Sequence, residues 1–306
     1  MKRIKIQAVT LMVLVWISSI GLCAEPFAKG PYLGQIPPGP IAQVFAPRLI
    51  CDTRPHRWES HGHFSADGNT FCFGRRRLVF ITENTDQGWT TPERIKSIPY
   101  RVWSPCLSPD ANSIYFSRKY DPPKGWTLHR CIRTSQGWSS PKELGPPFNP
   151  LGAAFSVTAD NSICFITGRG RFWIAPFVGN TWARAIKLPV ERGSLRGCHP
   201  GIAPDASFMV FYSIRPGALD GTETDLYLTL READGTWTRP RNMGPGINSG
   251  YYEHGARISP DKKYMFFTRS NGWGRYSYCD TSDIYWVELK EYLPESYRSS
   301  EGISRK

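Results

Sequence analysis

The sequence lacks any long apolar stripe at helical spacing, and only its C-terminal end has the pattern of a short surface helix. A protein built mainly from helices needs such stripes to bury, so a helical fold is disfavoured. The chain instead has 28 glycines and 26 prolines among its 306 residues. This composition favours an all-β protein that is rich in turns.

Several signatures of enzyme chemistry are also missing. The chain has no Gly-x-Ser-x-Gly elbow, no Ser-His-Asp order and no phosphate-binding glycine loop, which removes the common hydrolase and nucleotide-binding motifs. No Cys-x-x-Cys pair occurs among the eight cysteines, so a cysteine-based zinc site has little support. We therefore expect no cofactor and no metal.

The N-terminal segment is the one stretch that could enter a membrane. Residues 2–5 carry three basic side chains, residues 8–22 are nearly all apolar, and small residues follow at 23–24. This order predicts a secretory signal peptide over 1–24, and hence a periplasmic or secreted protein with no transmembrane segment after cleavage. A short uncleaved anchor is the alternative. A lipid anchor on Cys23 is disfavoured by the bulky leucine before it.

The net charge of +12 raises the question of an acidic partner. A basic balance can indicate nucleic acid, anionic lipid or acidic polysaccharide. Export argues against nucleic acid, and the arginines are scattered apart from 75–77, which we interpret as a solvated face. We expect a monomer whose partner is a protein or polysaccharide of the cell envelope.

A turn built around aspartate recurs five times along the chain. The five aspartates are Asp67, Asp110, Asp160, Asp205 and Asp261, spaced 43 to 56 residues apart. Each has an apolar residue three positions earlier and an unbroken apolar run shortly after, such as 71–73 or 265–267. Aspartate forms turns by bonding its own backbone, so we interpret these residues as structural.

A second marker, typified by Gly88-Trp89 and Gly137-Trp138, follows in four of the five units. A short apolar strand precedes the marker and another follows it. Each unit therefore reads as four short antiparallel strands in about 45 residues, which is the size of a propeller blade. A blade is covered by a neighbour on both faces, and this explains the unbroken apolar runs.

The fifth unit has no fourth strand, but a candidate lies at the other end of the chain, at about 43–50. If it pairs antiparallel to 284–289, the ring closes without an open edge. The expected fold is an all-β, five-bladed β-propeller of four-stranded antiparallel blades, closed by this N-terminal strand in the last blade. The expected parts are an extended leader at 25–42, the propeller at 43–293 and a polar tail at 294–306. Cys51 and Cys279 flank the closing strands, so a disulfide between them is a hypothesis.

The fifth unit also carries a family resemblance. Its pattern Ile247-Asn248-Ser249, Glu253-His254, Ser259-Pro260-Asp261, Ser282-Asp283-Ile284-Tyr285 resembles the TolB-type, WD-repeat-like β-propeller repeat of exported bacterial proteins. The resemblance spans 40–290 and implies a binding scaffold in the cell envelope. Only Glu59 and Glu253 keep the acidic residue that precedes the first strand in this pattern. It also leads us to expect that Arg269 pairs with Asp283 across a hairpin.

Glu59 and Glu253 enter the first strands of units one and five, which would be neighbours in a closed ring. His61 and His254 lie beside them, and His199 enters unit four. Such groups could bond loop backbone, bind a ligand or metal, or act as acid and base. Our expected binding residues are Glu59, His61, Trp103, Arg196, His199, Tyr252, Glu253 and His254.

Two functions remain open. The first, which we favour, is a binding scaffold for a protein or glycan partner at the channel mouth, with no catalytic residues. The alternative is a carbohydrate-active hydrolase that uses Glu59 and Glu253 as its carboxylate pair.

Overall fold

The computed structural model describes residues 27–52, 57–121, 125–148, 154–167, 170–190, 198–213, 224–271 and 281–298. The signal peptide expected at 1–24 lies outside these ranges. The described chain is almost entirely strand and turn, with short 3-10 helices at η1 (Pro31–Gly34) and η3 (Glu295–Tyr297). No helix in this part of the chain is long and apolar enough to span a membrane. The all-β prediction is confirmed.

Each sequence unit folds as an antiparallel meander. Unit one comprises β2 (Arg57–Phe64), β3 (Thr70–Arg75), β4 (Leu78–Thr85), β5 (Gly88–Trp89) and β6 (Glu93–Arg94). Unit two comprises β7 (Trp103–Leu107), β8 (Ser113–Lys119), β9 (Trp126–Thr134), β10 (Gly137–Trp138) and β11 (Lys142–Glu143). In both units the first three long strands pair in chain order.

The remaining units repeat this plan. Unit three comprises β12 (Phe155–Val157), β13 (Ile163–Thr167), β14 (Arg171–Ala175), β15 (Phe177–Val178), β16 (Thr181–Trp182) and β17 (Ile186–Lys187). Unit four comprises β18 (Cys198–Ile202), β19 (Phe208–Ser213), β20 (Asp225–Leu230) and β21 (Arg241–Asn242). Unit five comprises β22 (Tyr252–Ile258), β23 (Tyr264–Ser270) and β24 (Thr281–Glu288).

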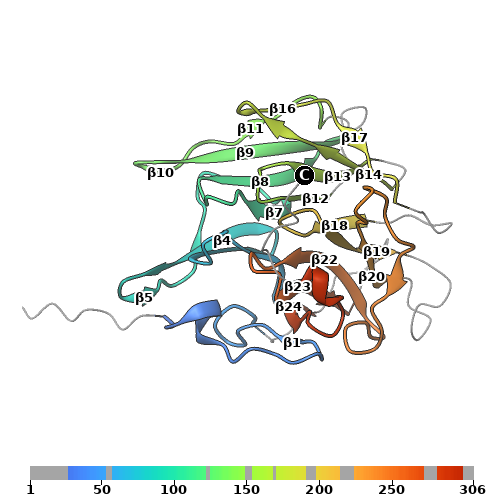
Figure 1. Cartoon of the computed structure of the whole chain (residues 1–306). Helices are drawn as coiled ribbons and strands as arrows, with labels where there is room; N and C mark the ends of the chain where they lie inside the picture. The colour runs from blue at the N-terminus through green and yellow to red at the C-terminus, as the bar shows by residue number, and fades with distance from the viewer. Residues whose placement is uncertain are drawn as a thin grey trace, which may run out of the picture.

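The units follow one another in space as they do along the chain. Figure 1 shows them in colour order, from cyan β4 through green β9 and ochre β19 to red β22–β24. The first strands are in contact in the same order, because β2 contacts β7, β7 contacts β12, β12 contacts β18 and β18 contacts β22. The first strand of unit five, β22, is also in contact with β2, the first strand of unit one. The innermost strands of the first and last units therefore meet.

The apolar core is divided between neighbouring units. The described residues form five buried clusters, and each draws its side chains from two adjacent units. The second strand of a unit serves two clusters at once: Phe71 and Phe73 of β3 face unit five, while Cys72 faces unit two. All three are fully buried. Burial on both faces explains why the run has no polar residue.

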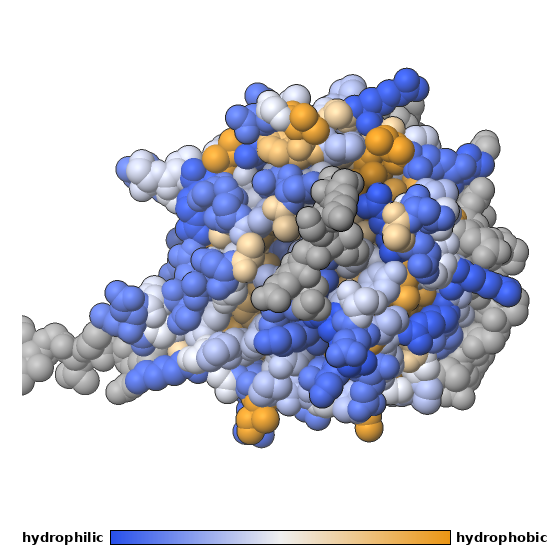
Figure 2. Space-filling view, viewed as in Figure 1, coloured by the Kyte–Doolittle hydropathy of each residue, from blue (hydrophilic) through white to orange (hydrophobic). Residues whose placement is uncertain are grey.

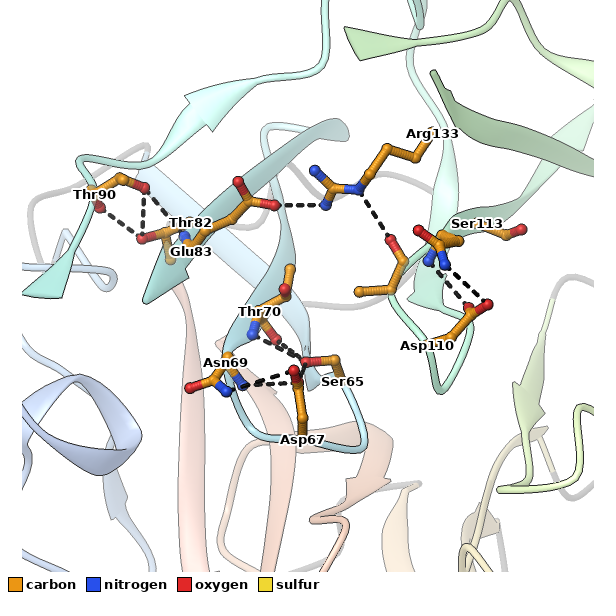
Figure 3. A network of polar contacts seen from close by, with 12 residues as sticks. Ser65, Asp67, Asn69, Thr70, Thr82, Glu83, Thr90, Asp110, Ser113 and Arg133 are labelled. Atoms are coloured by element: carbon orange, nitrogen blue, oxygen red, sulfur yellow. Dashed lines mark hydrogen bonds and ion pairs between the residues drawn. The ribbon is translucent and has the colours of Figure 1, made fainter. Parts of the chain in front are cut away.

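The aspartate turns are structural, as predicted. In unit one the Ser65 hydroxyl donates to Asp67 Oδ1 at 2.5 Å, and the Asn69 backbone N–H donates to the same oxygen at 3.0 Å (Figure 3). Unit two repeats these bonds at Asp110. Each carboxylate thus satisfies the backbone of its own turn. Figure 3 also shows Arg133 of unit two pairing with Glu83 of unit one at 2.5 Å, a link between neighbouring outer strands.

The N-terminal segment completes the last unit. Strand β1 (Gln43–Val44) pairs antiparallel with β24, with Gln43 opposite Trp286 and Val44 opposite Tyr285. The expected strand at 43–50 is shorter than predicted, because Ala46 and Arg48 have positive φ angles of 45° and 68°. These angles turn the chain away from an extended path. One further bond continues the pairing, from Phe45 N–H to Ile284 O at 2.8 Å.

The segments on both sides of β1 pack over the junction of units one and five. Leu33 and Phe45 are fully buried in the cluster that also holds Phe64 and Trp286. The Trp89 indole N–H donates to Gly30 O at 2.7 Å. The leader is therefore part of the packed structure, although its sequence predicted only an extended segment.

Replacing Phe45 by alanine tests this role. The Phe45 ring lies 5.0 to 6.0 Å, centroid to centroid, from the rings of Phe64, Phe71, Phe266 and Trp286. The resulting cavity should lower the free energy of unfolding by about 3–5 kcal/mol, measured by urea denaturation. Ile36→Ala, at an 87% exposed position, should change it by less than about 0.5 kcal/mol. Equal effects of the two substitutions would contradict the role assigned to Phe45.

Candidate functional site

The first strands of units one, two, four and five share a β-bulge. Their pairing registers shift between Ser60 and His63, Trp103 and Cys106, Cys198 and Gly201, and His254 and Arg257. Within the shifts, four residues have positive φ: His61 (56°), Ser104 (49°), His199 (52°) and Gly255 (65°). Each stands six positions before its unit's turn aspartate. The bulge therefore occupies the same repeat position in four units.

The bulges bring three histidines together. The ring centroids of His61, His199 and His254 are 5.3, 5.5 and 5.7 Å apart. One ring nitrogen from each lies within 4.8 Å of the others. All three side chains are buried, with exposed fractions of 5%, 3% and 8%. We call these residues the histidine cluster.

Unit two contributes a hydroxyl beside this cluster. Ser104 Oγ lies 3.3 Å from His61 Nε2, and Ser104 is itself buried. In unit five the equivalent residue is Gly255, where a Cβ would come within 2.9 Å of the His61 ring. Glycine at this position therefore leaves space for the imidazole of His61, while His254 supplies its ring from the preceding position.

Burial keeps the cluster uncharged. It lowers the pKa of His61 and His199 well below the usual value, and the neighbouring positive charges, Arg257 among them, act in the same direction. Burial also lowers the pKa of His254 to about 4. At neutral pH the three rings are thus neutral imidazoles, and each has a nitrogen lone pair.

Arg257 is a second unusual group, close to His61 and His199. It is 2% exposed, and its guanidinium donates from Nη1 to Ala256 O at 3.0 Å. Its Nε and Nη2 atoms have no hydrogen-bond partner among the described residues. A buried guanidinium normally has its donors satisfied, so these two atoms are an exception among the buried polar groups of the described chain.

The two candidate carboxylates are both in ion pairs. Glu59 and Glu253 are fully buried. Arg75 Nε donates to Glu59 Oε1 at 2.7 Å, and Arg269 Nε donates to Glu253 Oε1 at 2.8 Å. Arg269 was expected to pair with Asp283 across a hairpin; the two lie opposite each other in the β23–β24 register, but the ion pair of Arg269 is with Glu253.

Each of these arginines also donates a hydrogen bond to the backbone of the segment that precedes its unit. Arg75 donates from Nη2 to Ile50 O, and Arg269 donates from Nη2 to Ile247 O, both at 2.7 Å. Units one and five thus repeat the same carboxylate–arginine–carbonyl bridge. This repetition indicates a structural role for the two ion pairs.

Burial also shifts the carboxyl pKa values. It raises the pKa of Glu59 to about 7, although the hydrogen bond and charge of Arg75 oppose the shift. It likewise raises the pKa of Glu253 to about 7, against the Ser249 hydroxyl and the charge of Arg269. Both values lie in the range of general acids, so the pKa alone does not separate a catalytic from a structural carboxyl.

A second group of possible metal ligands lies nearby. Cys51, Glu59 and Asp283 each have one ligand atom within 4.8 Å of the others. The Cys51 thiol already donates to Ile284 O at 3.5 Å and accepts from Ile284 N–H at 3.2 Å. Cys51 is a buried free cysteine. Its proposed disulfide partner, Cys279, lies outside the described residues.

The remaining expected binding residues divide three ways. Trp103 is half-buried, with the Arg77 guanidinium 4.4 Å above its ring and the Trp126 ring edge-on at 5.0 Å. Tyr252 is half-buried at the start of β22. Arg196 lies outside the described residues.

Three contributors to the site were missed in the sequence: Ser104, Arg257 and Arg75. One signal could have found Ser104, because it stands six positions before Asp110 as His61 stands before Asp67. When the units are aligned on their aspartates, Arg257 stands four positions before Asp261, two residues after the bulge position held by Gly255. Arg75 was interpreted as part of a solvated triplet, and no local pattern distinguishes it.

Comparisons with known proteins bear on the fold. The chain matches no protein-family model and no curated protein. A solved structure assigned as TolB, from Agrobacterium tumefaciens, is 16% identical with a TM-score of 0.51, covering 76% of this chain and 78% of that one. A GH43 endo-arabinanase from Bacillus licheniformis is 12% identical with a TM-score of 0.50, covering 78% and 96%. The fold is of the β-propeller type. At such low identity the likeness concerns the fold alone.

Replacing Glu253 by glutamine tests its buried carboxyl. The folded protein holds this proton up to about pH 7, whereas an ordinary carboxyl releases it near 4.5. In the wild type, this group should therefore lower the free energy of unfolding by up to about 3 kcal/mol as the pH rises through that window. The variant lacks this loss, so its stability relative to the wild type should improve with pH in urea titrations. Glu93→Gln, at an exposed position, is the control; a constant difference for Glu253→Gln would contradict the shift.

Proposed function

We propose that this protein is an exported β-propeller that binds a glycan or protein partner at the face where the bulged first strands begin. In this proposal five blades form a closed ring, with β1 completing the last blade. The cyclic contacts among the first strands and the five shared apolar clusters support the ring. Export rests on the N-terminal sequence pattern.

The observation that carries the binding proposal is a group of half-buried tryptophans and an arginine next to the histidine cluster. Arg77 lies between two rings, 4.4 Å from the Trp103 centroid and 5.7 Å from that of Trp58. Trp103 is adjacent to Ser104, whose hydroxyl is in contact with His61. We call Trp58, Arg77, Trp103 and Trp126 the tryptophan rim. Tryptophan and arginine are the residue types that dominate binding hot spots.

The chemistry of the rim favours a glycan with acidic groups over a neutral one. Flat indole rings offer apolar faces, and Arg77 offers donors for a carboxylate or sulfate. Without residues 1–24, which hold three basic and no acidic residues, the net charge is +12 − 3 = +9, and it acts in the same direction at long range. Figure 2 shows that the face seen there is largely hydrophilic, with hydrophobic residues gathered mainly near its upper edge.

The hydrolase alternative depends on Glu59 and Glu253. The endo-arabinanase likeness favours it, but only at the level of the fold. Two observations count against it: both carboxylates are fully buried, and each is already bound by an arginine that also ties the incoming chain. A catalytic pair has to reach the scissile bond from two sides. Binding without hydrolysis is therefore the function that we favour.

Trp103→Ala is the direct test of the binding proposal. Screened on an array of acidic and neutral glycans, the wild-type protein should bind selectively, and this variant should bind about tenfold or more weakly, because a hot-spot side chain contributes at least about 1.4 kcal/mol. Trp138→Ala is the matched control, since Trp138 also stacks under an arginine, Arg133 at 4.6 Å, but on an outer strand. Equal losses in both variants would contradict a rim-based site.

Hydrolysis is measured in parallel. Wild-type protein incubated with the bound polysaccharides should release no new reducing ends. Release that disappears in Glu59→Gln and Glu253→Gln would establish the hydrolase alternative instead. Absence of any glycan binding, together with capture of a specific envelope protein that Trp103→Ala abolishes, would assign the rim to a protein partner.

A further inference from the structure

The histidine cluster has the composition and spacing of a transition-metal site. Its three members come from β2, β18 and β22, strands of three different units, and one ring nitrogen of each lies within 4.8 Å of the others. Nitrogens bound at 2.0–2.1 Å to a tetrahedral metal are about 3.4 Å apart. Side-chain rotations that shorten these separations by up to about 1.4 Å would bring three ligands onto one ion.

Two of these residues have a strained backbone conformation. His61 and His199 have φ angles of 56° and 52°, and a non-glycine residue in this region is strained by about 1–3 kcal/mol. Such strain concentrates at functional sites, and bulges are used to re-aim a side chain. The equivalent residue in unit five is glycine, which avoids the strain but provides no ring. There, His254 supplies the third imidazole from the adjacent position.

The surroundings favour a ligand role over simple packing. His61 Nδ1 is buried without a hydrogen-bond partner among the described residues, which is a poor solution for an imidazole that only fills space. Ser104 Oγ, 3.3 Å from His61 Nε2, adds a polar oxygen from a fourth unit. In the Cys51, Glu59 and Asp283 group, the Cys51 thiol is hydrogen-bonded to Ile284, and Glu59 is in an ion pair with Arg75.

We propose that His61, His199 and His254 bind one divalent transition-metal ion, of the zinc type, with its fourth position open. Three histidines are a frequent ligand set for an ion that keeps an exchangeable fourth ligand. The buried Arg257, with Nε and Nη2 unsatisfied within the described chain, lowers the affinity of a bare cation. It favours an ion whose fourth ligand is an anion, such as hydroxide or a carboxylate.

This inference deepens the proposed function, because Ser104, whose hydroxyl contacts His61, is next in sequence to Trp103 of the tryptophan rim, and an open metal position could take a carboxylate of the bound partner. Its test requires no partner. Failure of metal binding would leave rim binding intact, and failure of rim binding would leave the metal site intact.

The experiment is a titration of purified protein without a polyhistidine tag, stripped with EDTA, with Zn²⁺ alone. Calorimetry should give one ion per chain. His61→Gln and His199→Gln should each weaken binding by at least about tenfold, because even outer-shell changes at metal sites cost 10- to 100-fold. Saturating Zn²⁺, at about 100 times Kd, should raise the wild-type Tm by about 5–10 °C and that of the variants by much less.

His129→Gln is the matched control. His129 is also a buried histidine, 4% exposed, but it stacks on Phe116 at 5.5 Å in unit two and should keep wild-type affinity. Circular dichroism establishes that each variant is folded. Absence of saturable Zn²⁺ binding by the wild-type protein would overturn the proposal. Binding that all three variants retain, or lose equally, would also overturn it.

Discussion

Burial of the second strand of each unit on both faces is the constraint on which the rest of this structure depends. Side chains of β3 alternate between the cluster shared with unit five and the cluster shared with unit two, so no unit has a core of its own among the described residues. Each unit needs both neighbours to remove its apolar run from water. The segments on both sides of β1 meet the same need at the junction of the first and last units, where Leu33 and Phe45 are buried.

Packing the units in this way also determines what lies at the centre. The first strands approach one another so closely that a Cβ at Gly201 would lie 2.5 Å from Ala256 O. Bonds between units hold them together: Ile202 N–H donates to Ser156 Oγ of the neighbouring first strand at 3.1 Å, and His61 N–H donates to Thr268 Oγ1 of β23 at 3.1 Å. These bonds hold the bulges in place. The same contacts that join neighbouring units therefore support the strained residues that carry the histidine cluster.

Much of the fold could be predicted from the sequence, because the recurring aspartate turns and apolar runs report local geometry and double burial directly. The turn role of Asp67 and the pairing of 43–44 with the last unit were both predicted. The site was harder. A bulge changes which face a side chain points to, and no alternation of apolar and polar residues records it. His61, His199 and His254 could be named from the sequence as candidates, but their convergence, and the ion pairs that hold Glu59 and Glu253, depend on contacts between distant strands.

The pairing of β1 with β24 has a consequence for how the protein reaches its native state. Gln43 pairs with Trp286, so Gln43 has to wait for a residue that is synthesised 286 − 43 = 243 residues later. At ribosomal rates of about 5–20 residues per second, that delay is on the order of 10–50 s. During this delay, the aromatic cluster around Phe45 has its residues from unit one but not those from unit five. A chain that crosses a membrane N-terminus first would meet the same delay on the far side, where the incomplete apolar surface needs protection until the last strand arrives.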